Sequence, residues 1–297
     1  MNLHGVLPPI PTPFVDDGID HPALAANVKQ WMATRLSGIV ALGSNGEAPL
    51  LDERESDAVI ATVRDAVPRD RLFIVGTGRE STAATIAATR RAAERGADLV
   101  LVRTPSFFKN VMTSDAFVRH YTAVADAAPV PVLLYNVTMY TGVNLLPDAV
   151  MRLADHPNIV GMKESGGDIA QIAECVSRTP DRFSVLAGSA TTVFAALCVG
   201  AVGAVLALSA VLPDLCVELH NLVQQSRYDE ARALQQRLAP LARLLGSAHG
   251  IAGLKYALDQ IGYRGGPPRA PLLPLSADAA RQISEQLMQL EVLARRV

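Results

Sequence analysis

LFIVGTGRESTAATIAATRRAAERGADLVLV, residues 72–102, is the stretch that decides the fold class of this 297-residue chain. Its two ends, Leu72–Val75 and Leu99–Val102, are apolar runs of strand length, and the alanine-rich stretch between them, Thr82–Glu94, has helical periodicity. A strand, a helix and a second strand in this order form a βαβ unit, whose two strands pair in parallel. The segment therefore predicts an α/β fold with parallel strands.

The same alternation repeats along the chain. Eight strand–helix repeats predict a closed (β/α)₈ barrel, a fold of about 250 residues in typical cases. A doubly wound open sheet is the alternative, but no GxGxxG motif follows the first strand and Gly76-Thr77-Gly78 lacks the third glycine. The further strands are expected at Val6–Ile10, Ile39–Leu42, Val132–Tyr135, Ile159–Met162, Ser184–Leu186 and Ala204–Ala207, and further helices at Ala23–Leu36, Glu53–Ala66, Ser114–Ala127 and Ile169–Val176.

Only helical patterns follow Arg227. They predict helices at Tyr228–Leu245, Gly250–Ile261 and Ser276–Arg295. We therefore expect a barrel catalytic domain over residues 1–226 and a C-terminal helical extension over residues 227–297 that packs on the barrel.

Composition excludes several classes of function. The chain is 49% hydrophobic and 19% charged, and its net charge is −2. Because no basic excess is available to neutralise a phosphate backbone, nucleic acid is not an expected partner. The three cysteines, Cys175, Cys198 and Cys216, lack CxxC spacing. This pattern argues against a disulfide framework and a zinc site, and favours a reducing compartment.

Residues Val193–Leu212 form one uncharged stretch long enough to span a membrane. Its glycines and alanines, with no aromatic belt or flanking basic cluster, favour a buried helix that leads into a buried strand. The first residues, MNLHGVLPPIPTPF, show no basic and apolar signal-peptide pattern. We therefore expect no membrane partner and a cytoplasmic location.

Lys163 ends a predicted strand, at the end of a barrel where reactive groups gather. With a period of two, Ile159, Gly161 and Lys163 are expected on one face of the strand. A lysine inside a barrel mouth loses hydration, which favours the neutral amine, and a neutral amine forms a Schiff base with a ketone. The alternative is a lysine that extends to the solvent or pairs with Glu164.

Two further strand ends carry groups that fit this chemistry. Tyr135 closes the preceding strand and could transfer protons beside the lysine, although a core tyrosine is the alternative. The loop Gly43-Ser44-Asn45-Gly46-Glu47 offers backbone amides, a hydroxyl and a side-chain amide that suit a small carboxylate. An ordinary turn that caps the next helix is the alternative for this loop.

Together these residues resemble the dihydrodipicolinate synthase / N-acetylneuraminate lyase family of class I aldolases, from Gly5 to about Leu275. The resemblance implies a barrel with a helical tail, usually a homotetramer, and neither cofactor nor metal. It also implies that Lys163 forms the Schiff base, Tyr135 relays protons, and Ser44 acts in the relay. The markers are Pro11-Thr12-Pro13-Phe14, Gly43–Glu47, Tyr135-Asn136-Val137, Thr141-Gly142, the Lys163 segment and Leu186–Ser189; the expected substrate-binding residues are Ser44, Asn45, Gly46, Ser165, Gly188 and Tyr140.

Departures from the family pattern bear on the substrate. The synthases typically have Thr where this chain has Asn45, and a carboxylate-binding Arg where it has Tyr140. The loop that normally supplies a tyrosine to the neighbouring subunit's proton relay offers only Phe107 and Phe108. The proline after Tyr-Asn-Val is replaced by Thr138.

The Ser44-Asn45 pair and the segment Lys163–Asp168 are closer to 4-hydroxy-2-oxoglutarate aldolase. We therefore expect cleavage of 4-hydroxy-2-oxoglutarate to pyruvate and glyoxylate, with Ser165 on the distal carboxylate. The alternatives are dihydrodipicolinate synthesis and a sugar-acid lyase or dehydratase. A catalytically weak protein that binds 2-oxo acids is the alternative from a different class.

Overall fold

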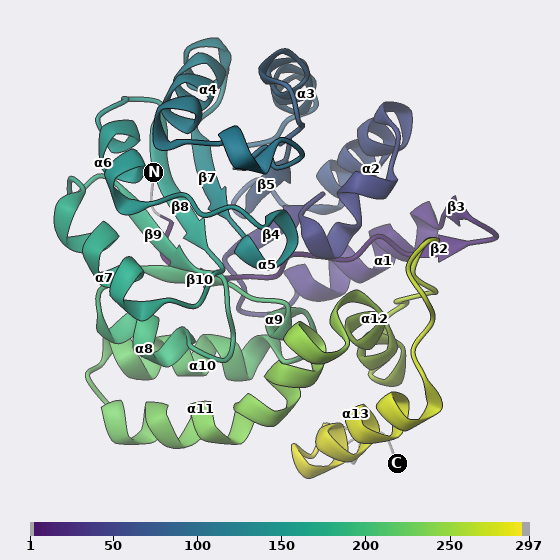
Figure 1. Cartoon of the computed structure of the whole chain (residues 1–297). Helices are drawn as coiled ribbons and strands as arrows, with labels where there is room; N and C mark the ends of the chain where they lie inside the picture. The colour runs from purple at the N-terminus through teal and green to yellow at the C-terminus, as the bar shows by residue number, and fades with distance from the viewer. Residues whose placement is uncertain (1–2, 293–297) are drawn as a thin grey trace.

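The computed structural model describes residues 3–292 and shows eight parallel strands in a barrel with helices around them (Figure 1). The strands are hydrogen-bonded in the order β1-β10-β9-β8-β7-β6-β5-β4. The N–H of Val40 donates to the Pro8 carbonyl (3.0 Å) and the N–H of Ile10 donates to the Val40 carbonyl (2.9 Å), which joins β4 to the residues that directly follow β1. The predicted barrel is confirmed. Its strands are β1 (Gly5–Leu7), β4 (Gly38–Ala41), β5 (Leu72–Gly76), β6 (Leu99–Arg103), β7 (Val132–Asn136), β8 (Ile159–Glu164), β9 (Ser184–Ala187) and β10 (Gly203–Val205).

The helices begin where capping side chains occur in the sequence. Asp52 and Glu55 form a reciprocal capping box at the start of α2, and Ser81 accepts a hydrogen bond from an N–H group in the first turn of α3. Such caps satisfy N–H groups that have no partner within the helix. The helices are α1 (His21–Met32), α2 (Glu53–Ala66), α3 (Thr82–Glu94), α4 (Ser114–Ala127), α5 (Thr138–Thr141), α6 (Pro147–Ala154), α7 (Ile169–Arg178), α8 (Val193–Cys198), α9 (Leu208–Val211), α10 (Pro213–Gln224), α11 (Tyr228–Arg243), α12 (Gly250–Gln260) and α13 (Ala277–Gln289).

Two apolar cores hold the barrel together. The larger core lies between strands and helices, and the smaller one includes Leu7, Val40, Leu133 and Leu186, which come from four different strands. The predicted helix followed by a buried strand within residues 193–212 is present as α8 and β10. Among residues 3–292, no helix is long and apolar enough to cross a membrane.

Strand β8 departs from the predicted alternation. Ile159 packs in the larger core, between strands and helices, and not beside Lys163. The reason is that the pairing of β7 with β8 shifts register between Val132 and Leu133. The expectation that Ile159, Gly161 and Lys163 share one face is therefore wrong for Ile159. Beyond the shift, Leu133 pairs with Gly161 and the pairing is regular to the end of the strand.

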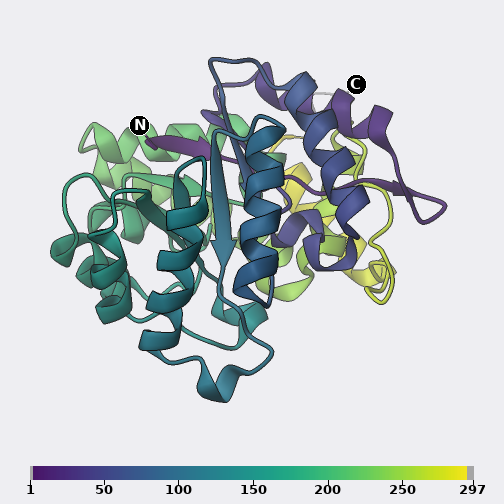
Figure 2. The ribbon, with the colours of Figure 1, turned by 90° about the horizontal axis from the view of Figure 1, so that it is seen from above.

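The last helices pack beside the barrel, and the segment that leads into α13 lies beside residues near the N-terminus. A π-helical turn, Leu244–Ala248, joins α11 to the region of α12. A short hairpin, β2 (Phe14–Val15) and β3 (Gly18–Ile19), follows the first barrel strand and was not predicted. In two views at right angles, the yellow segment before α13 passes beside this purple hairpin (Figures 1 and 2).

Candidate active site

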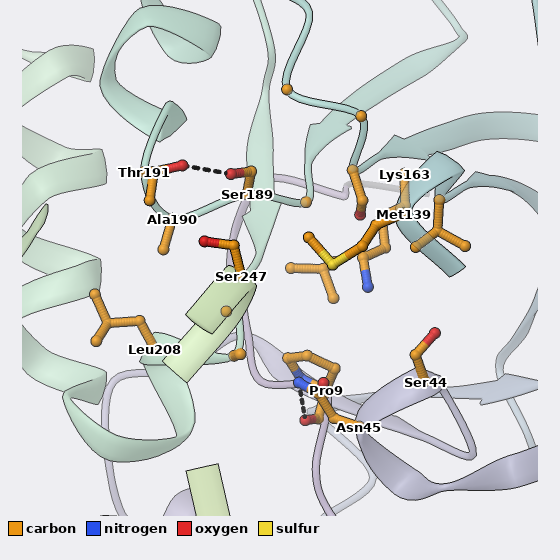
Figure 3. Close-up of a pocket in the computed structure, with 18 of the residues that line it drawn as sticks. Pro9, Ser44, Asn45, Met139, Lys163, Ser189, Ala190, Thr191, Leu208 and Ser247 are labelled. Atoms are coloured by element: carbon orange, nitrogen blue, oxygen red, sulfur yellow. Dashed lines mark hydrogen bonds between the residues drawn. The ribbon is translucent and has the colours of Figure 1, made fainter. Parts of the chain in front are cut away.

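The carboxyl ends of the strands surround a cavity of about 360 Å³ (Figure 3). All the residues predicted to act on the substrate line this cavity, with the exception of Gly46. The predicted residues in the lining are Ser44, Asn45, Tyr135, Tyr140, Lys163, Ser165 and Gly188.

Lys163 and Tyr135 are cross-strand neighbours at the ends of β8 and β7. Both are buried, with 3% and 5% of their surface exposed, and the Lys163 Nζ lies 4.3 Å from the centroid of the Tyr135 ring. No ion pair to Lys163 is found within the described part of the chain. The pair therefore presents an uncompensated amine and a phenol to the same cavity.

Glu164 follows Lys163 in the strand, but its carboxylate lies in a separate network of amides. It accepts hydrogen bonds from Asn136 Nδ2 (2.7 Å), Gln171 Nε2 (3.0 Å) and the Gly166 N–H (2.5 Å). Burial raises the pKa of Glu164 above its usual value, while these hydrogen bonds oppose the rise. In the structure, Glu164 therefore does not pair with Lys163, contrary to one of the alternatives from the sequence.

The loop after β4 places Ser44 and Asn45 on the cavity. The Ser44 Oγ and Tyr135 Oη lie 3.2 Å apart, within hydrogen-bond distance, and Asn45 Nδ2 contacts the Pro9 carbonyl at 3.4 Å. Gly46 has a different role, because its N–H donates to Gly43 and its carbonyl accepts from Thr12 Oγ1. These hydrogen bonds brace the loop, and Gly46 is not part of the cavity lining.

Ser165 lines the cavity and has a buried hydroxyl. Its Oγ is buried and has no hydrogen-bond partner among residues 3–292. Gly188 lies against it so closely that a Cβ at position 188 would be 1.9 Å from this oxygen. Glycine at position 188 therefore leaves room for the Ser165 hydroxyl.

The far wall of the cavity contains residues that were not among the predicted substrate-binding residues, although Ser189 belongs to the Leu186–Ser189 marker. Ser189 and Thr191, whose hydroxyl oxygens are 2.9 Å apart, lie opposite Lys163 and Ser44, and Ser247 of the π-helical turn lies with them (Figure 3). Sequence periodicity places residue 247 only in a gap between two tail helices. The small residues Gly246 and Ser247 were the one available signal in the sequence. The π-helical turn itself, a feature that is frequent at functional sites, is visible only in the structure.

Tyr140 lines the cavity and is 53% exposed, whereas Phe107 and Phe108 do not line it. The two phenylalanines are 76% and 69% exposed, and their rings meet edge to face with centroids 5.0 Å apart. Glu80 holds this loop by accepting a hydrogen bond of 2.8 Å from the Phe107 N–H. The loop therefore gives no hydroxyl to the cavity of its own chain.

The donor set of the site does not suit a metal. Within residues 3–292, no group of three His, Cys, Asp or Glu side chains is arranged to hold a metal ion. The cavity lining consists of hydroxyls, amides, apolar groups and a single basic residue, Lys163.

Comparisons with known proteins agree with this geometry. The sequence profile of the dihydrodipicolinate synthetase family matches residues 2–290. A 4-hydroxy-tetrahydrodipicolinate synthase of an Exiguobacterium species is 34% identical over 286 residues, which cover 96% of this chain and 97% of the relative.

Solved structures show the same similarity. The 4-hydroxy-tetrahydrodipicolinate synthase of Methylacidiphilum fumariolicum SolV has a TM-score of 0.93 at 33% identity, over 99% of this chain and 98% of the other. The dihydrodipicolinate synthase of Acinetobacter baumannii, solved in complex with pyruvate, has a TM-score of 0.93 at 29% identity, over 98% of this chain and 100% of the other.

Proposed function

The chain belongs to the dihydrodipicolinate synthetase family, and on this premise we propose that Lys163 forms a Schiff base with the ketone of pyruvate or a related 2-oxo acid. As a family member, the chain is an enzyme of the class I aldolase type that acts on carbon–carbon bonds. The observation that carries the proposal is the buried Lys163 amine, 4.3 Å from the Tyr135 ring and free of a carboxylate partner among the described residues. The pyruvate complex of the Acinetobacter relative supports the choice of 2-oxo acid.

The residues around the amine divide the chemistry. Lys163 attacks the ketone carbon and water leaves, so that a protonated imine forms. Loss of a methyl proton gives an enamine, which adds to an aldehyde. In the reverse direction a bond beta to the imine carbon breaks and releases the aldehyde; the enamine that remains on Lys163 is then protonated, and water hydrolyses the imine to free pyruvate. Tyr135 moves the protons, and Ser44, 3.2 Å from its hydroxyl, is the next member of the relay. Ser44 and Asn45 bind the carboxylate of the 2-oxo acid.

For the second substrate we rank condensation of pyruvate with aspartate semialdehyde first, ahead of the 4-hydroxy-2-oxoglutarate cleavage that the motifs favour. The relatives described above are named for the synthase reaction, and this outweighs the likeness of short motifs. The presence of Tyr140 in place of the family's Arg does not favour one reaction over the other, because aspartate semialdehyde and glyoxylate both carry a carboxylate. Either carboxylate would have to bind to hydroxyl and amide groups such as Ser165 and Ser189, since Lys163 is the only basic residue in the described lining.

The aldolase stays the second candidate because of Ser165. Its buried, unpartnered hydroxyl lies two residues from Lys163, which suits the distal carboxylate of a short substrate better than that of a longer one. A sugar-acid lyase or dehydratase ranks below both. A protein that only binds 2-oxo acids would show no imine.

The test is a parallel assay of both reactions with one preparation. The first arm measures condensation of pyruvate with aspartate semialdehyde, and the second measures pyruvate release from 4-hydroxy-2-oxoglutarate. Borohydride trapping with pyruvate reports the imine separately. We expect trapping, and a higher kcat/KM in the first arm. A higher kcat/KM in the second arm would reverse the ranking, and the absence of trapping would contradict the Schiff base itself. Ser165→Ala should weaken the second arm more than the first.

We also propose a homotetramer in the cytoplasm, as the resemblance implies. Exposed apolar side chains gather on one loop: Phe107, Phe108 and Val111 are each more than 60% exposed. Such clusters commonly mark contacts between proteins. Sedimentation velocity should show a tetramer, and Phe107→Ser with Phe108→Ser should shift it to smaller species.

A further inference from the structure

A buried ion pair joins the loop that carries Ser44 to the C-terminal extension. The Nζ of Lys255, in α12, lies 2.5 Å from Oε1 of Glu47, and the two side chains are 1% and 0% exposed. The second carboxylate oxygen of Glu47 accepts a hydrogen bond of 2.8 Å from the Arg269 N–H. Both oxygens of Glu47 are therefore held by residues of the extension.

The lysine is fixed in its turn by neighbours from both ends of the chain. Its Nζ donates to the Pro267 carbonyl at 2.8 Å and lies 4.3 Å from the centroid of the Phe14 ring. The Arg269 guanidinium lies 4.4 Å from the same centroid and donates to both oxygens of Glu55 at 2.7 Å. These contacts lie where the yellow segment before α13 passes beside the purple hairpin in Figures 1 and 2.

The loop needs such support because its backbone is in a costly conformation. Glu47 has φ 56° and ψ 30°, and Leu42, just before the loop, has φ 54°. Residues other than glycine rarely adopt this left-handed region, and they persist there only where surrounding contacts enforce it. Ser44 and Asn45 lie between these two residues.

We propose that the Glu47–Lys255 pair is a positioning device, through which the C-terminal extension sets the affinity of Ser44 and Asn45 for the carboxylate of the 2-oxo acid. The proposal rests on the proposed function. Neither Glu47 nor Lys255 lines the cavity, so both are positioning residues and neither is catalytic.

A double variant separates positioning from folding. Removal of one member of a buried ion pair leaves an uncompensated charge, whereas replacement of both by neutral groups of similar size is often tolerated. Glu47→Gln/Lys255→Met is therefore the test variant. The matched control is Arg64→Met/Asp98→Asn, because Arg64 is 6% exposed, its pair with Asp98 (3.5 Å) is also partly buried, and neither residue touches the loop or the cavity.

The measurements are the dissociation constant of pyruvate by calorimetry, the KM for pyruvate, kcat, and thermal unfolding. Misplacing two hydrogen-bonding side chains should raise the pyruvate dissociation constant and KM about tenfold in the test variant. Its kcat at saturating pyruvate should fall by a smaller factor than the affinity, because Lys163 and Tyr135 keep their places and only Ser44 of the relay is displaced. The control should bind pyruvate like the wild type.

A folded test variant that binds pyruvate like the wild type would overturn the proposal, because the pair would then be structural only. An equal loss of affinity in the control would overturn it too. Should the double variant fail to fold, Glu47→Asp takes its place, since it keeps a carboxylate for Lys255 but withdraws it by one methylene, and the same affinity criterion applies. Absence of borohydride trapping in the wild type would contradict the proposed function alone, because pyruvate binding still compares the variants.

Discussion

Two lysine–glutamate pairs in this chain have opposite arrangements. Lys163 and Glu164 are consecutive in β8, yet their side chains do not meet. Glu47 and Lys255 belong to opposite ends of the chain, yet their charged atoms are 2.5 Å apart. Both lysines are buried, and the Nζ of each lies 4.3 Å from the centroid of an aromatic ring. They differ in that Lys255 has a carboxylate partner, whereas Lys163 has none among the described residues.

The comparison shows why a buried lysine is not by itself a nucleophile. Successive residues of a strand point to opposite faces, so β8 directs Lys163 into the cavity and Glu164 towards the amides of Asn136 and Gln171. Burial lowers the pKa of Lys255, and the carboxylate of Glu47 opposes that change. A carboxylate beside a lysine stabilises the protonated amine, and a protonated amine has no lone pair to attack a ketone.

The strongest test of this difference is the site of covalent labelling. Pyruvate with borohydride should add a stable mass to the peptide that contains Lys163, and Lys163→Ala should abolish the adduct completely. Glu47→Gln/Lys255→Met should keep it at saturating pyruvate. Peptide mapping by mass spectrometry is the measurement. A label on Lys255 would show that the lysine with the carboxylate partner is the nucleophile.

Two phenols line the cavity, but only Tyr135 contacts both Lys163 and Ser44. Since positioned proton transfer contributes about 10²–10⁴-fold, Tyr135→Phe should reduce kcat by that range. Tyr140→Phe is the matched control and should keep most of the turnover. Steady-state kinetics of both variants decide the matter, and the opposite order of effects would move the relay to Tyr140.

Stability should respond to the two lysines in different ways. Lys255→Met leaves the buried charge of Glu47 without a partner and should cost about 3–5 kcal/mol of unfolding free energy. Adding Glu47→Gln should restore most of that loss. Lys163→Met leaves no carboxylate unpaired and should cost less than about 1 kcal/mol, or stabilise the protein. Urea unfolding measures all three, and equal losses for Lys163→Met and Lys255→Met would remove the distinction drawn above.

The loop that carries Phe107 and Phe108 lacks the tyrosine hydroxyl that the family pattern implies for the neighbouring subunit's proton relay, and adding one oxygen atom there should raise turnover. If the relay extends across a subunit boundary, Phe108→Tyr should supply the hydroxyl that this loop lacks and raise kcat by about tenfold or less, with little change in KM. Phe107→Tyr is the equivalent variant if the register differs by one residue. Phe108→Leu is the control and should not raise kcat. A rise in KM without a rise in kcat would argue against a role in proton transfer.

The smallest effect concerns Glu164. Its folded pKa is raised by burial, so the carboxyl contributes most to stability below about pH 4.5, and this contribution falls as the pH rises through the folded pKa. The unfolding free energy of Glu164→Gln should therefore improve relative to the wild type as the pH increases above 4.5. Urea unfolding over a pH series checks the sign, and a relative loss with rising pH would contradict it.

Much of the molecule was predictable because its signals are local. Helices α2, α3 and α4 begin and end where periodicity and capping residues place them, since caps such as Asp52 act within one turn. The strands were predictable as apolar runs. Six of the seven predicted residues that line the cavity lie at or just after strand ends, which meet at one edge of a barrel, whereas Tyr140 lies in α5 and was predicted from the family resemblance. The boundary between residues 226 and 227, and the part of the last predicted helix beyond residue 292, stay predictions.

From its local patterns alone, the chain specifies the order of strands and helices and the residue types at each strand end. Folding in three dimensions decided the rest. It brought Ser247 to the far wall of the cavity, left Gly46 out of the cavity lining, shifted Ile159 out of the face of Lys163, and paired Glu47 with Lys255. Each of these depends on contacts between residues that are distant in sequence or on a local change of strand register, and neither leaves a periodic signal in the sequence. The reactivity of a lysine belongs to this second group, because it depends on which carboxylate lies beside it.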